Sequence, residues 1–205
     1  IQTPPDVLSF FLSDTGARVV LCEADLASLF DTQTLSGTLL ETVVIANGEG
    51  GVDDGHVSVE TFLAGHLTEL KCADTNPDDM AFWMYSSGST GRPKGIVHLH
   101  HDMAYTQQSF GAHILRLNPD DICFSVPKIY FAYGFGNALT FPFSVGATTV
   151  LMPGQPRPEA VLDTIEAYRP TVLFGLPTLY TALARSEGVE GRDLSCIRQS
   201  MSAAE

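Results

Sequence analysis

The chain has 205 residues, of which 44% are hydrophobic and 17% are charged. This composition is typical of a packed globular protein and excludes a disordered or fibrous chain. Because 11 Lys and Arg face 24 Asp and Glu, the net charge is −13. A field of that sign repels nucleic acid and anionic membrane surfaces, so we expect no nucleic-acid and no membrane partner.

Cysteine usage and the chain ends predict an intracellular fragment. The cysteines are widely spaced, which predicts reduced thiols rather than a zinc site: Cys22, Cys72, Cys123 and Cys196. No run of about 18 apolar residues is present, and the first residues do not form a leader peptide, which predicts a cytoplasmic protein. The sequence begins without Met and ends without a closing helix, so we expect both ends to be cut.

Helical and strand-like patterns alternate along the chain. The first part predicts a helix from Val7 that stops at Gly16, strands at 17–22 and 42–46, helices at 24–30 and 59–65, and a surface loop at 47–56. The second part predicts strands at 80–85, 95–99, 122–126, 147–152 and 171–174, and helices at 102–115, 158–168 and 177–185. Such alternation predicts an α/β fold with a layered parallel or mixed β-sheet and helices on both faces.

A run of serines, threonine and glycines stands between two of these strands. Candidate phosphate-binding residues within it are Ser86, Ser87, Gly88, Ser89, Thr90, Gly91, Lys94 and Gly95. Glycines let backbone N–H groups turn toward an anion, hydroxyls add donors, and the lysine adds positive charge. A Walker loop requires Gly-Lys-Ser/Thr at the start of a helix. Here the glycines and the lysine have a different spacing and a strand-like run follows them, so the sequence does not predict a Walker loop.

The ten residues Ser86 to Gly95 resemble the signature of the adenylate-forming superfamily, which includes acyl- and aryl-CoA ligases. The resemblance implies that Ser89 and Thr90 hold the β- and γ-phosphates of ATP. It also implies that residues 1–205 are the central, incomplete part of the N-terminal AMP-binding domain. Residues 1–79 would be a βα segment of one subdomain, and residues 80–205 would carry the phosphate loop, the acid pocket and the following βα units. The C-terminal domain would be absent.

A second segment combines aromatic rings with small residues. Its candidate aryl-binding residues are Phe131, Ala132, Tyr133, Gly134 and Gly136. Tyr and Phe can stack on a benzene ring, and we expect the glycines to leave room for it. The segment resembles the aryl-binding stretch of benzoate– and 4-hydroxybenzoate–CoA ligases. No acidic residue occurs between Asp121 and Glu159, which argues against an amino-acid substrate, since its buried ammonium would lack a partner.

Two further segments follow the same resemblance. Gly175 is expected near the acid pocket. The last residues, Ala203, Ala204 and Glu205, resemble the start of the adenine-side loop, in which Ala204 replaces the usual glycine. The family's catalytic Lys, its Mg²⁺-binding Glu and its ribose-binding Asp are expected outside this chain.

A histidine-rich stretch follows the phosphate loop. His98 and His100 would share one face of a strand, with His101 facing away at the start of a helix. No further ligand set is evident, so we predict no metal site here. The resemblance instead places His100 or His101 near the acyl side.

The resemblance implies a function for the full-length protein. ATP, with Mg²⁺, would activate benzoate as an adenylate, and coenzyme A would displace AMP, giving benzoyl-CoA, AMP and pyrophosphate. The fragment alone would be inactive. A 4-hydroxybenzoate– or aminobenzoate–CoA ligase and a catalytically silent nucleotide-binding module remain open, as does the oligomeric state.

Overall fold

The computed structural model describes residues 3–48, 56–66, 68–86 and 91–204. It divides into two compact units, Ile1–Cys72 and Ala73–Glu205, which are described separately. Most of the predicted loop 47–56 lies outside the described residues. The subdomain boundary between residues 79 and 80, which the sequence analysis placed there, stays a prediction. No helix in the described part of the chain is both long and apolar enough to cross a membrane.

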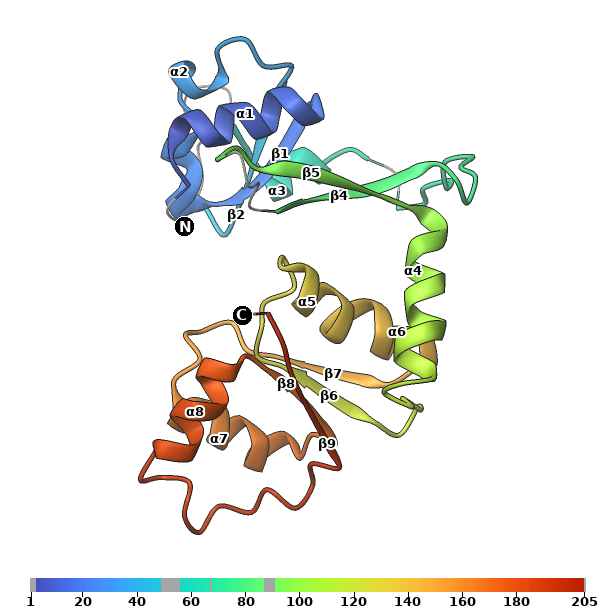
Figure 1. The fold of residues 1–205 in the computed structure, drawn as a ribbon. Helices are drawn as coiled ribbons and strands as arrows, with labels where there is room; N and C mark the ends of the chain where they lie inside the picture. The colour runs from blue at the N-terminus through green and yellow to red at the C-terminus, as the bar shows by residue number, and fades with distance from the viewer. Residues whose placement is uncertain (1–2, 49–55, 67, 87–90, 205) are drawn as a thin grey trace. The chain divides into compact units, whose positions relative to one another are not determined.

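The first unit is built on a parallel sheet with the strand order β1-β2-β3 (Figure 1). The strands are β1 (Val19–Glu23), β2 (Thr42–Ala46) and β3 (His56–Ser58). The helical elements are α1 (Pro5–Thr15), the 3₁₀ helix η1 (Ala24–Leu29), α2 (Thr32–Leu35) and α3 (Val59–Leu63). Gly16 ends α1 in the left-handed conformation, as the sequence predicted. Strand β3 was not predicted, because three residues give too short an alternation.

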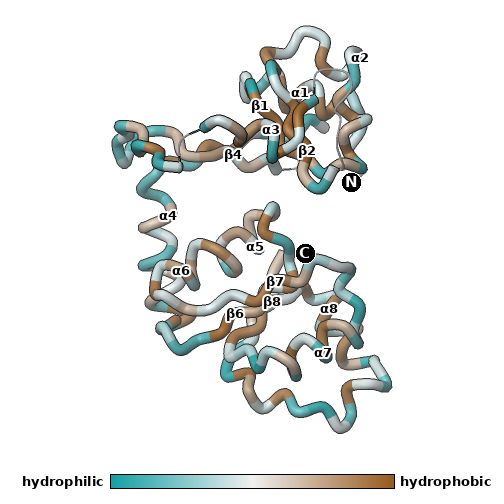
Figure 2. Tube along the Cα trace, turned by 180° about the vertical axis from the view of Figure 1, so that it is seen from behind, coloured by the Kyte–Doolittle hydropathy of each residue, from teal (hydrophilic) through white to brown (hydrophobic). Residues whose placement is uncertain are grey.

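The second unit contains a four-stranded parallel sheet with the order β7-β6-β8-β9. Its strands are β6 (Ile122–Ser125), β7 (Thr148–Leu151), β8 (Val172–Gly175) and β9 (Gln199–Ser202). Strand β9 was not predicted, since its residues are mostly polar and its place depends on pairing with β8. The strands of both parallel sheets carry much of the hydrophobic colouring in Figure 2.

Helices cover both faces of this sheet, which confirms the predicted layering (Figure 1). On one face, Phe124 and Leu173 pack against α7 (Pro158–Tyr168) and α8 (Pro177–Arg185). On the other face, Cys123 and Phe174 pack against a helical stretch of α5 (Ala132–Phe135), the π-helix η3 (Gly136–Thr140) and α6 (Phe141–Val145). Successive strand residues point to opposite faces, so both clusters form from the same two strands.

A separate antiparallel hairpin carries the phosphate-loop sequence. Its strands are β4 (Met80–Ser86) and β5 (Lys94–Leu99), with Tyr85 opposite Gly95 and Ser86 opposite Lys94. The two strands therefore flank the serine- and glycine-rich run, of which Ser86, Gly91, Lys94 and Gly95 are among the described residues. The chain continues into α4 (His100–Thr106) and the π-helix η2 (Gln107–Ala112), where a single α-helix at 102–115 had been predicted.

Candidate active site

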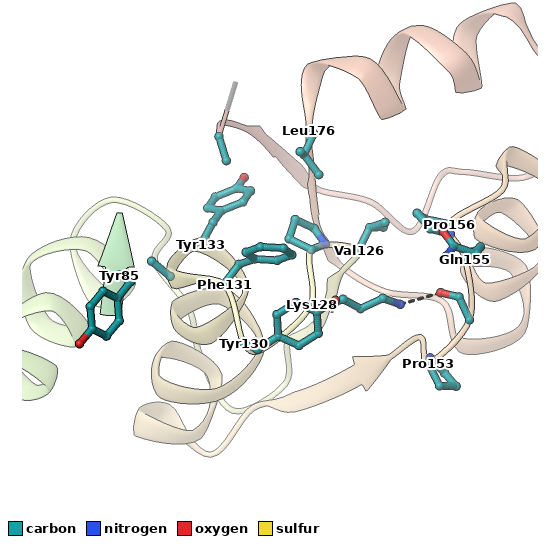
Figure 3. Close-up of a pocket in the computed structure, with 14 residues that line it drawn as sticks. Tyr85, Val126, Lys128, Tyr130, Phe131, Tyr133, Pro153, Gln155, Pro156 and Leu176 are labelled. Carbon is teal, nitrogen blue, oxygen red and sulfur yellow. Dashed lines mark hydrogen bonds between the residues drawn. The ribbon is translucent and has the colours of Figure 1, made fainter. Parts of the chain in front are cut away.

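A cavity of about 800 Å³ opens at the carboxyl edge of the four-stranded sheet (Figure 3). All four strands are parallel, so the segments that follow them meet at one edge, where ligands of open α/β sheets usually bind. The segments after β6, β7, β8 and β9 and the end of β4 supply the lining: Tyr85, Val126, Pro127, Lys128, Tyr130, Phe131, Ala132, Tyr133, Pro153, Gly154, Gln155, Pro156, Leu176 and Ala204.

Three aromatic residues after β6 give the cavity flat apolar walls. The rings of Tyr130 and Phe131 lie 4.7 Å apart and tilted, and Tyr133 meets Phe174 edge-on at 6.5 Å. Phe131, Ala132 and Tyr133, which the sequence singled out, therefore line one cavity together. This arrangement suits the face and edge of an aromatic ligand.

The Tyr133 hydroxyl is not directed into the cavity. It donates to the backbone carbonyl of Met201 at 3.1 Å, and Figure 3 shows it pointing away from Lys128 and Tyr130. Burial, reinforced by the neighbouring Tyr180, raises the pKa of Tyr133 to about 12. The phenol is neutral at physiological pH, and its ring is the part offered to a ligand.

Lys128 is a cavity residue that the sequence analysis did not single out. Its ammonium donates to the carbonyl of Met152 and, at 2.7 Å, to that of Gly154, so it fastens the segment after β7 (Figure 3). Burial lowers the pKa of Lys128. The sequence signal that could have identified Lys128 is a lysine shortly after a buried strand in a strongly acidic chain.

The glycines of the aromatic segment are required by packing. A Cβ on Gly134 would lie 2.0 Å from the Lys128 carbonyl oxygen, and one on Gly136 would lie 2.8 Å from the Phe141 ring. Neither residue lines the main cavity. Protein atoms occupy the space beside each missing Cβ, and contact of either glycine with a substrate ring stays a prediction.

Gly175 makes room for a side chain in the same way. A Cβ there would lie 2.9 Å from the Tyr180 ring, and Gly175 is not among the residues lining the cavity, although Leu176 is. Gly175 directly precedes the cavity-lining Leu176, and its place near an acid pocket stays a prediction.

A second, smaller cavity of about 150 Å³ lies between the hairpin and α5. Ala132 lines both cavities, and Gly136 lines this one. His98 also lines it, stacked on Phe82 at 4.9 Å.

The structure corrects the predicted placement of the histidines. Helix α4 begins at His100, so His98 and His100 do not share a strand face. His101 pairs with Asp78 and Asp102, at 3.1 Å and 3.2 Å. Within the residues that the structure describes, no group of three or more His, Cys, Asp or Glu could hold a metal ion.

Tyr85, which directly precedes the predicted phosphate loop, lines the main cavity. Ser87, Gly88, Ser89 and Thr90 lie outside the described residues. Gly91 has a φ of +85°, a left-handed backbone conformation that favours glycine. Gly95 packs against the Tyr85 ring.

The predicted adenine-side residues follow β9. The Ala203 N–H donates to the Gly175 carbonyl at 3.4 Å, and Ala204 lines the main cavity. Ala204 has a φ of +65°, a conformation that glycine adopts more easily. Glu205 lies outside the described residues.

Comparison with known proteins identifies the family. The model of the AMP-binding enzyme family matches residues 1–205. The chain belongs to this family. The match covers every residue of the chain, so both compact units are parts of an AMP-binding enzyme.

Named relatives activate aromatic acids. The benzoate–CoA ligase of Thauera aromatica is 41% identical over 174 residues, which are 85% of this chain and 32% of that protein. A 4-hydroxybenzoate–CoA/benzoate–CoA ligase of Rhodopseudomonas palustris is 34% identical over 197 residues, 94% of this chain and 36% of that protein. The crystal structure of the anthranilate CoA ligase AuaEII in complex with anthranoyl-AMP superimposes with a TM-score of 0.90 at 35% identity, covering all of this chain and 39% of that one. The chain thus spans about a third of the length of the curated relatives it matches.

Proposed function

We propose that the longer protein to which this chain belongs is an aryl-CoA ligase. ATP converts benzoate into benzoyl-adenylate and pyrophosphate, and the thiol of coenzyme A then displaces AMP to give benzoyl-CoA. The adenylate supplies the leaving group that a free carboxylate lacks, which is why the reaction consumes ATP.

One observation carries this proposal above the others. The cavity at the carboxyl edge of the sheet is walled by Phe131, Ala132 and Tyr133 and is bordered by Tyr85 and Ala204. An aromatic slot therefore lies between the strand that leads into the phosphate loop and the segment assigned to adenine. A volume of about 800 Å³ accommodates an aryl-adenylate, which is larger than benzoate.

The roles of individual residues follow from this arrangement. We assign the triphosphate of ATP to residues 86–91 with Lys94 and Gly95, and the benzene ring to Phe131, Ala132 and Tyr133. The adenine belongs to residues 203–205. Mg²⁺ enters with ATP, and the family's metal-binding carboxylate and catalytic lysine belong to residues outside this chain.

A substituted benzoate is the second candidate for the acid. Relatives are named for 4-hydroxybenzoate and anthranilate as well as benzoate. Benzoate is favoured because two polar groups beside the aromatic wall already have partners: the Tyr133 hydroxyl is bonded to Met201, and Lys128 is bonded to two carbonyls. A ring hydroxyl or amine needs a polar partner that these groups do not supply.

The test is AMP formation by the full-length protein with ATP, coenzyme A and a panel of acids. We expect benzoate to give a higher kcat/KM than 4-hydroxybenzoate, 2-aminobenzoate or a fatty acid of similar size. A matched protein carrying Tyr133→Ala should show a raised KM for benzoate, since the ring wall is lost. A preference for a hydroxylated or aminated acid would replace the benzoate assignment. Failure to turn over any acid in the panel would support a silent nucleotide-binding module.

A further inference from the structure

Two tyrosines from different helices meet at one backbone carbonyl. The hydroxyl of Tyr133, in α5, lies 3.1 Å from the Met201 carbonyl oxygen, and the hydroxyl of Tyr180, in α8, lies 2.9 Å from the same oxygen. Tyr180 also reaches the Leu173 carbonyl at 3.2 Å. Burial raises the pKa of both phenols, so each remains a donor across the physiological range.

The carbonyl belongs to a strand that is otherwise held on one side. In the described sheet, β9 is the last strand and pairs with β8 alone, with Met201 opposite Phe174. Beyond the strand, the backbone bond from Ala203 to Gly175 is long, at 3.4 Å, and Ala204 holds a strained φ of +65°. The tyrosine hydroxyls are therefore well placed to fix the strand end from which the cavity-lining Ala204 extends.

The surrounding residues are shaped to deliver both hydroxyls. The Tyr180 ring lies across Gly175, where any Cβ would approach it to 2.9 Å. The Tyr133 ring meets Phe174 edge-on, one strand away from the carbonyl that its hydroxyl contacts. Gly175 therefore leaves space for the Tyr180 ring, and Phe174 packs against the Tyr133 ring, so that both hydroxyls reach the Met201 carbonyl.

We propose that Tyr133 and Tyr180 are positioning residues that together clamp the Met201 carbonyl and so set the Ala203–Ala204 segment against the nucleotide. This inference rests on the proposed function, which assigns that segment to adenine. It divides Tyr133 into two roles: the ring faces the acid, and the hydroxyl acts on the nucleotide side through β9. One side chain thereby links the two halves of the site.

The test separates the ring from the hydroxyl in the full-length protein. Calorimetric titration with MgATP and with benzoate gives a dissociation constant for each ligand. Tyr133→Phe keeps the ring, so we expect the constant for ATP to rise roughly 5- to 10-fold, as for loss of one hydrogen bond, while that for benzoate changes by less than about twofold. Tyr133→Ala should raise both constants.

Tyr180→Phe gives an independent check, because Tyr180 does not line the cavity. We expect the same selective loss of ATP affinity. The double variant should lose more ATP affinity than either single variant, because each single variant keeps one of the two hydroxyl contacts to the shared carbonyl. Tyr168→Phe is the matched control at the exposed end of α7 and should change neither constant.

Unchanged ATP affinity in the double variant would overturn the clamp. Equal loss of both ligands in Tyr133→Phe, together with a lowered Tm, would also overturn it, since a merely structural role weakens both. If the wild-type protein binds ATP but not benzoate, the proposed substrate is wrong. The ATP dissociation constants of the variants still test the positioning role of Tyr133 and Tyr180. Wild-type protein that does not bind ATP would defeat both proposals.

Discussion

Ala204 has a backbone conformation that is unfavourable for a residue with a Cβ atom. Its φ of +65° lies in the left-handed region, which costs a residue with a Cβ about 1–2 kcal/mol. Glycine avoids this cost but loses more chain entropy on folding, about 0.4–1 kcal/mol. We therefore expect Ala204→Gly to raise the free energy of unfolding of the full-length protein by about 0.5–1 kcal/mol, measured by chemical denaturation.

The neighbouring alanine supplies the control. Ala203 is not among the residues with positive φ, so Ala203→Gly should lower the free energy of unfolding through chain entropy alone. Opposite signs at two adjacent alanines would be hard to explain by anything except backbone conformation. A destabilising Ala204→Gly would show that the methyl group makes contacts that outweigh the strain.

At the scale of the elements, one carboxylate joins the amino ends of three strands. Asp121, which precedes β6, is 3% exposed and accepts from Arg198, before β9, at 2.8 Å and 2.6 Å, and from Thr171, before β8, at 2.6 Å. Burial alone would raise the pKa of Asp121, but these hydrogen bonds and the guanidinium charge lower it overall. The ion pair therefore ties three strands together at the edge opposite the cavity.

Removing this carboxylate should destabilise the second unit. We expect Asp121→Asn to reduce the free energy of unfolding by roughly 2–3 kcal/mol, less than for a fully buried pair because the Arg198 side chain is 39% exposed. Urea unfolding of the 205-residue chain, followed by the fluorescence of its single tryptophan, Trp83, measures the change. Asp120→Asn makes the same charge change at the adjacent exposed residue and should have little effect.

The pH dependence has a definite sign. Because the folded-state pKa of Asp121 lies below the ordinary value for an aspartate, its contribution is fully present above that ordinary value and is lost as the pH falls through the folded-state pKa. The wild-type protein should therefore lose stability more steeply than Asp121→Asn below about pH 4. Parallel pH profiles would contradict a contribution from this carboxylate.

At the scale of the whole molecule, the chain spans about a third of its relatives' length. We expect the residues that the family resemblance assigns to Mg²⁺, ribose and catalysis to lie outside this chain. We expect the purified 205-residue chain to release no pyrophosphate above background from benzoate and ATP, in a coupled pyrophosphate assay. Full-length protein under the same conditions is the positive control, and release by the chain alone would show that these residues are dispensable for adenylation.

Local pattern was sufficient for the elements that depend on their own residues. Helices α7 and α8, strand β2 and the stop at Gly16 have the predicted bounds, because apolar periodicity and a terminal proline or glycine act within a few residues. Strands β3 and β9 were missed, since short or polar strands are selected by their partners. The π-helical segments were missed because a helical period does not distinguish the two hydrogen-bond patterns.

The sequence by itself determined the α/β class, the family through Ser86 to Gly95, and the aromatic segment around Tyr133. Only the tertiary structure decided what those residues contact. It assigned Gly134, Gly136 and Gly175 to protein packing, brought Lys128 to the cavity wall, and turned the Tyr133 hydroxyl toward Met201. The physical reason is that motifs and periodicity follow from neighbours in sequence, whereas these contacts join residues up to 68 positions apart.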